Sequence, residues 1–128
     1  MATRLRTAQR GQSLVEFALG AILLFTLVFG IVEMGRLMYS YSVVASAARE
    51  GARKGAIEYS QSAVEAAVRD RAVAMDLSRL EIAPIQQESG QVVVVVTYEF
   101  VPVTPLISAL APSVSLGSEA RQFQEVMP

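Results

Sequence analysis

The chain has 128 residues, of which 52% are hydrophobic and only 18% are charged. This balance predicts one small domain joined to an unusually apolar segment. Because the chain has no cysteine and no histidine, it lacks disulfides, thiolate metal ligands, the usual general base and the commonest metal ligand. Its formal net charge of -1 provides no electrostatic surface for nucleic acid. Most enzyme classes and nucleic-acid binding are therefore disfavoured.

The N-terminal segment has the pattern of a membrane anchor. Leu14 to Val32 is apolar except for Glu16 and Thr26, and a helix of that length is about 28 Å long, close to the roughly 30 Å hydrocarbon core of a bilayer. The basic residues before it are Arg4, Arg6 and Arg10. A basic head followed by an apolar span predicts one crossing, with the N-terminus in the cytoplasm and the rest of the chain on the far side.

An ordinary cleaved signal peptide is the alternative, because Ala45-Ser46-Ala47 has the small-residue spacing of a signal peptidase site. Such a site normally follows closely on a shorter apolar core. A retained anchor, trimmed only at its head, therefore fits the sequence better.

The helix should continue beyond the span to about Ile57, because no proline interrupts residues 33 to 57. Ala47, Gly51 and Gly55 recur at helical spacing, and a stripe of small residues lets another backbone approach closely. That backbone belongs either to the same domain or to another subunit, and the sequence leaves both open. A charged group on the same helix should face solvent or lipid headgroups: Arg49, Glu50, Arg53 and Lys54.

A second, amphipathic helix is predicted from Ser62 to about Leu77. Ser62 and Glu65 form a capping-box signature. The apolar positions that follow share one face: Val64, Val68, Ala72 and Met75. We expect this helix to cover a small sheet.

Val92 to Phe100 is the strongest predicted strand, because five consecutive valines favour extended backbone. Its second half should bury one face and expose the other, the buried residues being Val96, Tyr98 and Phe100 and the exposed ones Thr97 and Glu99. The other expected elements are a short strand at Leu80 to Gln86 that Pro84 confines to an edge or bulge, a turn at Gln87 to Gly90, an apolar connector packed on the domain at Leu106 to Ala111 after Pro102 and Pro105, and a last strand at Val114 to Phe123.

The fold class is therefore α+β, with a long N-terminal transmembrane helix continuing into a small domain of one further helix and a short antiparallel sheet. We divide the chain into a leader (1–11), the transmembrane and extended helix (12–59) and an extracytoplasmic domain (60–128). A domain of this size is marginally stable alone. We expect the sheet to dock on the long helix or on neighbouring subunits.

No catalytic group of residues is apparent. Lys54 is the only lysine, and nothing places a serine nucleophile beside it. Asp70, Asp76 and Glu81 do not have the spacing of a calcium loop or of a carboxylate pair. We expect no enzymatic activity, no cofactor and no metal.

Glu16 is the most informative residue of the span. A carboxylate at mid-bilayer costs about 2.5 to 3.5 kcal/mol, less near the edge, and such residues usually mark function. The simpler interpretation is a glutamate favoured by the dipole at a helix start. Its neighbourhood, Arg10-Gly11-Gln12-Ser13-Leu14-Val15-Glu16-Phe17, resembles the processing site of type IV-like prepilins, in which a basic leader ends in glycine and a glutamate stands five residues after it.

The resemblance extends over three blocks in order: Gly11 to Leu19, Gly30 to Arg36, and Ala47 to Arg53. Together they resemble the TadE family of minor pilins, or pseudopilins, of the tight-adherence (Tad/Flp) pilus system. The resemblance covers roughly residues 10 to 57, and the valine-rich strand and the C-terminal tail share only the general character of the family. The chain departs from the family at Gly20-Ala21-Ile22, where members commonly carry a proline.

The resemblance implies a pilin-like domain and cleavage by a prepilin peptidase between Gly11 and Gln12. In related filaments the glutamate at the position of Glu16, beside Phe17, pairs with the N-terminal amine of a neighbouring subunit. The implied partners are the prepilin peptidase, other Tad pilins and pseudopilins, the inner-membrane assembly platform and the lipid bilayer, with no nucleic acid. The implied location is the inner membrane, from which the protein can enter the pilus.

The function expected from this resemblance is that of a minor pilin or pseudopilin, a structural and assembly component of a pilus for adhesion, biofilm formation and surface attachment. A priming, tip or assembly role is favoured, because the far-side domain is larger than that of the short major pilins. Two alternatives stay open: a major pilin-like filament subunit, and an unprocessed single-span anchor whose domain binds a partner.

Overall fold

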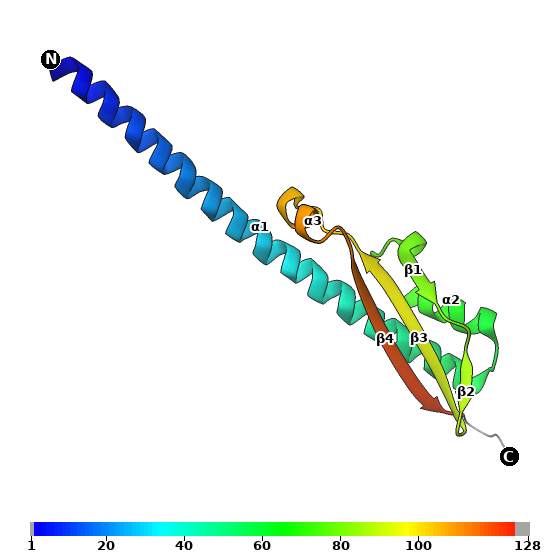
Figure 1. Cartoon of the computed structure of the whole chain (residues 1–128). Helices are drawn as coiled ribbons and strands as arrows, with labels where there is room; N and C mark the ends of the chain where they lie inside the picture. The colour runs from blue at the N-terminus through cyan, green and yellow to red at the C-terminus, as the bar shows by residue number, and fades with distance from the viewer. Residues whose placement is uncertain (1, 125–128) are drawn as a thin grey trace.

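The computed structural model describes the backbone of residues 2–124 and the side chains of residues 10–124. One long helix, α1 (Ala2–Ile57), runs the length of the molecule, and all other elements pack beside its C-terminal half (Figure 1). The helix passes through Gly20 without a break. It ends at Ile57, as the sequence predicted.

Helix α2 (Gln61–Arg71) follows after a short turn and is capped by a residue other than the predicted one. The N-cap is Ser60, whose hydroxyl accepts a hydrogen bond from the Ala63 N–H. Ser62 lies two residues after this N-cap, inside the first turn of the helix. Its hydroxyl lies 3.0 Å from that of Ser60. Glu65 accepts a hydrogen bond from the Gln61 side chain at 2.8 Å, so the predicted capping box is wrong.

Helix α2 is also shorter than predicted, because it ends at Arg71 instead of Leu77. Ala74 has a φ of 59°, which an α-helix does not allow. A short 3-10 helix, η1 (Leu77–Arg79), follows. Asp76 caps it by accepting hydrogen bonds from the N–H and the hydroxyl of Ser78, and these bonds lower the pKa of Asp76 below its ordinary value.

The sheet has four antiparallel strands, β1 (Leu80–Ile82), β2 (Gln86–Glu88), β3 (Gln91–Phe100) and β4 (Val114–Phe123). Strand β4 pairs with the whole length of β3, so β1 and β2 share the other edge of β3. The predicted single strand is thus two strands, interrupted at Pro84, which has no N–H to continue the ladder. The β2–β3 turn is Ser89–Gly90 alone, both with positive φ, as two-residue hairpin turns require.

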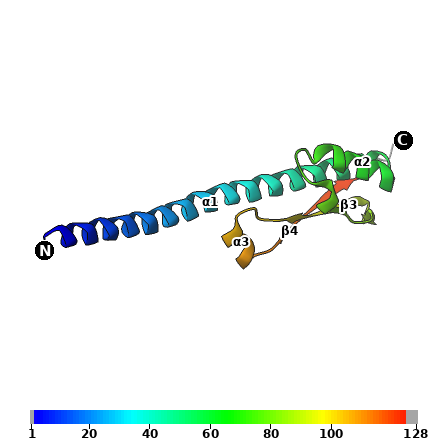
Figure 2. The same cartoon turned by 90° about the horizontal axis from the view of Figure 1, so that it is seen from above.

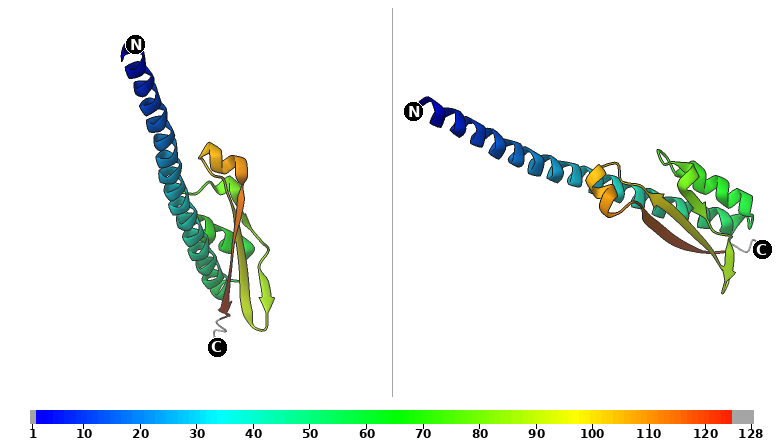
Figure 3. Two further views of the ribbon diagram at one scale, coloured as in Figure 1. Left: turned by 60° about the vertical axis from the view of Figure 1, so that its left-hand side comes forward. Right: turned by 45° about the horizontal axis from the view of Figure 1, so that its top comes forward.

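The core lies between α1, α2 and one face of the sheet, as Figures 2 and 3 show from other directions. Its fully buried side chains come from all three elements: Val44, Val64, Val68, Val92, Val94 and Val96. The predicted alternation in the second half of β3 is confirmed for Tyr98 and Phe100, which are buried, and for Glu99, which is exposed, whereas Thr97 is partly buried. Docking of the sheet on the long helix is confirmed as well. The division at residues 59 and 60, which stays a prediction, therefore separates two parts of one packed core.

The predicted apolar connector forms a third helix, α3 (Pro105–Leu110), which lies beside α1 at the end of the domain nearer the N-terminus (Figure 1). The expectation that this segment packs on the domain is wrong for two of its large side chains, since Leu106 is 56% and Leu110 is 82% exposed. The α+β class is confirmed, with two further α-helices in place of the expected one.

Candidate functional site

The apolar part of α1 projects from the domain and is not covered by the other residues whose side chains the structure describes. From Arg10 to Val32, every residue is exposed except Ala21 and Gly30, which are partly buried. By length and composition this helix is able to cross a membrane. A soluble helix with this many exposed large apolar side chains would aggregate, so another apolar phase has to surround it.

The residues of the proposed processing and pairing sites lie at the start of this uncovered helix. Gly11, Gln12, Glu16 and Phe17 are all exposed. Between Gln12 and Glu16 the helix rises by about 6 Å, or one turn. Among the residues whose side chains the structure describes, none forms a hydrogen bond or an ion pair with Glu16.

The second glutamate of the helix, Glu33, has the opposite surroundings, which the sequence did not predict. Its position beside Arg36 at the far boundary of the span would allow it to be solvated. Its side chain is instead 7% exposed. One carboxylate oxygen accepts hydrogen bonds from Arg36 at 2.8 Å and from the Val103 N–H at 2.9 Å, and the other lies 3.3 Å from the Thr104 hydroxyl.

Glu33 therefore fastens the segment between β3 and α3 to α1. Thr104 is the N-cap residue of α3, but its hydroxyl makes no capping bond within that helix and is directed to Glu33. Three donors surround one carboxylate, so its charge is compensated although it is buried.

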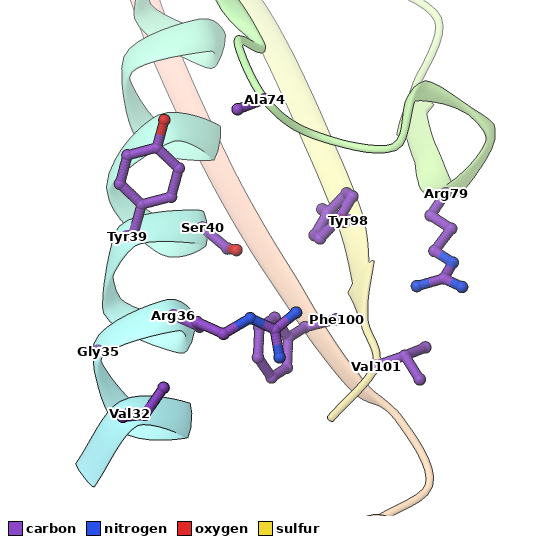
Figure 4. A pocket seen from close by; sticks show the side chains of 10 residues that line it. All are labelled: Val32, Gly35, Arg36, Tyr39, Ser40, Ala74, Arg79, Tyr98, Phe100 and Val101. Carbon is purple, nitrogen blue, oxygen red and sulfur yellow. The ribbon is translucent and has the colours of Figure 1, made fainter. Parts of the chain in front are cut away.

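Arg36 lies on the solvent side of the same contact. Its guanidinium lies 5.2 Å from the centre of the Phe100 ring, which is within the range of a cation–π interaction. A cavity of about 390 Å³ opens there between α1 and β3, with Arg36 on one wall and Arg79 on the other (Figure 4). Tyr39 and Ser40 complete the α1 wall. The cavity is polar and open, and it lies just beyond the end of the apolar span.

The small residues of α1 face the molecule's own domain. A Cβ on Gly51 would lie 2.6 Å from Val68 Cγ2 and 3.2 Å from Val94 Cγ1, and one on Gly55 would lie 2.9 Å from Val92 Cγ1. Ala47 is fully buried. The stripe of small residues therefore packs on the domain of its own chain, which is the first of the two alternatives that the sequence left open.

The charged group on the other side of α1 lies far from the span. Arg49 follows Val32 by about 26 Å along the helix, so the expected headgroup contact is out of reach. Arg49 and Arg53 are exposed and line a groove of about 580 Å³ between α1 and β4. In this groove Arg121 is hydrogen-bonded to Glu119, and this bond raises the pKa of Arg121. Of the two surroundings expected for this charged group, solvent and lipid headgroups, solvent is the one that Arg49 and Arg53 have.

The structure shows no arrangement for catalysis or metal binding within its described part. Lys54 lies 3.4 Å from Glu58 in an ion pair on the surface. No three acidic residues of the described part are grouped so that they could hold a metal ion.

These features define a class of membrane protein in which one helix is both the anchor and a layer of the extramembrane core. Residues 11–53, about one third of the chain, match the family of TadE-like proteins. This match supports a TadE-like protein of the Tad pilus system, the family that the sequence motifs predicted. This family is structural and not catalytic. No curated protein and no solved structure matches the chain.

Proposed function

We propose that the protein is a minor pilin or pseudopilin of a Tad pilus, which is cleaved between Gly11 and Gln12 and joins other subunits through its uncovered helix. The observation that carries this proposal is the carboxylate of Glu16, which lies exposed on the part of α1 that the described residues of the domain leave uncovered. It stands five residues after Gly11, the spacing of prepilins.

The charge of Glu16 supports a pairing role. In lipid, an unpaired carboxylate costs about 2.5 to 3.5 kcal/mol at mid-depth and less near the edge. Cleavage after Gly11 would create an amine on Gln12. Two opposite charges compensate each other in an apolar helix bundle only when their geometry is good. Pairing of Glu16 with the amine of a neighbour would therefore favour one axial stagger between subunits.

The continuity of α1 supports a subunit over a tethered anchor. The helix enters the core without a hinge, since α1 is unbroken from the span to Ile57. A force on the span is therefore transmitted directly to the domain. The span and the domain can move as one rigid body from the bilayer into a filament. A tether for a separate binding domain has no need of this rigidity.

Processing is tested with Gly11→Leu, because a bulky residue should not fit a peptidase cleft shaped for glycine. We expect mass spectrometry to find Gln12 at the N-terminus of the mature wild-type protein, and the uncleaved precursor of the variant to accumulate in the membrane. Gly20→Leu is the matched control, since a Cβ at either glycine meets no atom within 4 Å. Normal trimming of Gly11→Leu would refute the proposed site, and an intact wild-type N-terminus would favour the permanent anchor.

Assembly is tested with Glu16→Ala in a piliated strain. Loss of the charge should leave insertion and cleavage intact, while co-purification with other pilins and piliation should be lost. Thr26→Ala is the matched control, because Thr26 is the other polar residue of the span and bonds only to the Ile22 carbonyl of its own helix. Wild-type assembly of Glu16→Ala would overturn the pairing role.

Copy number separates a minor pilin from a major one. In sheared filaments we expect this protein in few copies beside an abundant short pilin. If it accounts for most of the filament mass, it is the major pilin-like subunit.

A further inference from the structure

The segment of the domain nearest the span, α3 with its neighbouring loops, contains no charged residue. Between Glu99 and Glu119 the sequence has no charged residue. This stretch contains α3, the loops on either side of it and the first half of β4. We call α3 and its two loops the α3 tip (residues 101–113). Its exposed large side chains are Val103 at 73%, Leu106 at 56% and Leu110 at 82%. A solvated tip would be expected to carry charges, as the opposite end of the sheet does with Glu88, Glu119 and Arg121.

The α3 tip lies at the level where α1 leaves its apolar span. A cavity of about 150 Å³ between the two helices is lined by Gly30 and Met34 on one side and by Ile107 and Ala111 on the other. Figures 1 and 2 both place α3 next to this part of α1, beyond the ends of β3 and β4. Since Val32 ends the span, α3 is level with the edge of the hydrocarbon core.

The two sides of α3 differ in their surroundings. Ile107 and Ala111 are partly buried toward α1. Leu106 and Leu110, one turn apart on the helix, form an apolar pair on another side and remain exposed. The exposed apolar surface of the span thus continues onto the tip of the domain.

The tip is also held in place. The carboxylate of Glu33 accepts the Val103 N–H and faces the Thr104 hydroxyl, which fixes the chain at the start of α3. Arg36, at the same level, is paired with Glu33 and is 44% exposed, so part of its guanidinium lies at the surface where phosphate headgroups would lie. An apolar pair at the hydrocarbon edge with a cation beside it is the pattern of segments that bind in the membrane interface.

We propose that the α3 tip inserts Leu106 and Leu110 into the lipid surface beside the span, so that the domain has a second contact with the bilayer and a fixed tilt on it. The proposal needs only that α1 spans the membrane. It does not depend on cleavage after Gly11 or on assembly into a pilus.

The absence of native cysteine allows a direct test on the full chain. Leu110→Cys, labelled with bimane, is reconstituted in bilayers of dioleoylphosphatidylcholine and dioleoylphosphatidylglycerol, with and without bromine on the acyl chains. We expect brominated lipid to quench most of the fluorescence and aqueous iodide to have little effect. Leu106→Cys should behave in the same way. Phe123→Cys is the matched control, because Phe123 is 68% exposed at the far end of β4, and there iodide alone should quench.

Two outcomes would overturn the proposal. If iodide quenches the Leu110 label as strongly as the Phe123 label, the tip is in water. If neither iodide nor brominated lipid quenches it, a protein surface covers the tip, and dilution of the protein in the bilayer then shows whether that surface is a second copy of this chain.

Discussion

Replacing Gly51 with alanine is the most direct test of how α1 is joined to the domain. The new Cβ would lie 2.6 Å from Val68 Cγ2, 3.2 Å from Val94 Cγ1 and 3.4 Å from Val64 Cγ1. All three valines are fully buried, and their branched side chains have few alternative rotamers. The backbone of α1 or α2 must therefore move to admit one methyl group.

The size of the effect follows from two opposing contributions. Overpacking a core usually costs about 1 to 3 kcal/mol. Alanine in place of glycine stabilises a helix by about 1 kcal/mol. Gly35→Ala carries the second contribution alone, because Gly35 lies in the same helix and a Cβ there would meet nothing within 4 Å. The two variants should thus differ by about 1 to 3 kcal/mol, with Gly35→Ala the more stable.

The assay is thermal unfolding of the full chain in detergent, followed by circular dichroism in the near ultraviolet, where Tyr98, which is buried in the core, reports. For a domain of this size each 1 kcal/mol corresponds to about 4 to 8 °C in Tm. Adding Val68→Ala to Gly51→Ala removes the nearest methyl group, so the two changes should cost less together than the sum of each alone. Equal Tm values for Gly51→Ala and Gly35→Ala would refute the intrachain packing. The stripe of small residues would then be explained by contacts between subunits.

Other predictions concern the α3 tip, the topology and the leader. Glu33→Ala should lose hydrogen bonds to a charged acceptor worth about 1.5 to 3 kcal/mol, so the Val103 amide should exchange roughly ten- to a hundredfold faster in hydrogen exchange, whereas Ser108→Ala in α3 should leave it unchanged. A reporter fused after Pro128 should be active only on the extracytoplasmic side, and protection of the domain from protease in intact spheroplasts would contradict this. Gly11→Leu should give a precursor heavier than the mature chain by the mass of residues 1–11.

The sequence predicted the elements whose signal is local. The valine run in β3 and the proline-free helix α1 have one stable conformation each over many consecutive residues, so the patterns identify them. The end of α1 at Ile57 and the bounds of β4 agree with the structure for this reason.

The errors share a different cause, because the deciding contacts lie far away in the sequence. The partner of Glu33 at Val103 is 70 residues distant, and no helical pattern shows that a carboxylate at the end of a span is buried. The cap of α2 depended on a choice between Ser60 and Ser62, which only the path of the chain after α1 decides. The exposure of Leu110 could not be predicted either, since an apolar connector normally packs on its own domain.

Glu16 and Glu33, the glutamates near the two ends of the apolar span, show what an assembly partner of this helix has to supply. They stand about 26 Å apart along one rigid helix. The carboxylate of Glu33 is compensated by three donors of its own chain, whereas Glu16 has no such donor among the described side chains. The apolar surface of the span is exposed on all sides and attracts any apolar neighbour at any height, because hydrophobic contact is not directional. In the proposed filament only the charge of Glu16 distinguishes one axial position of a neighbouring helix from another. A neighbour must therefore place its cation beside Glu16 before the span can leave the bilayer.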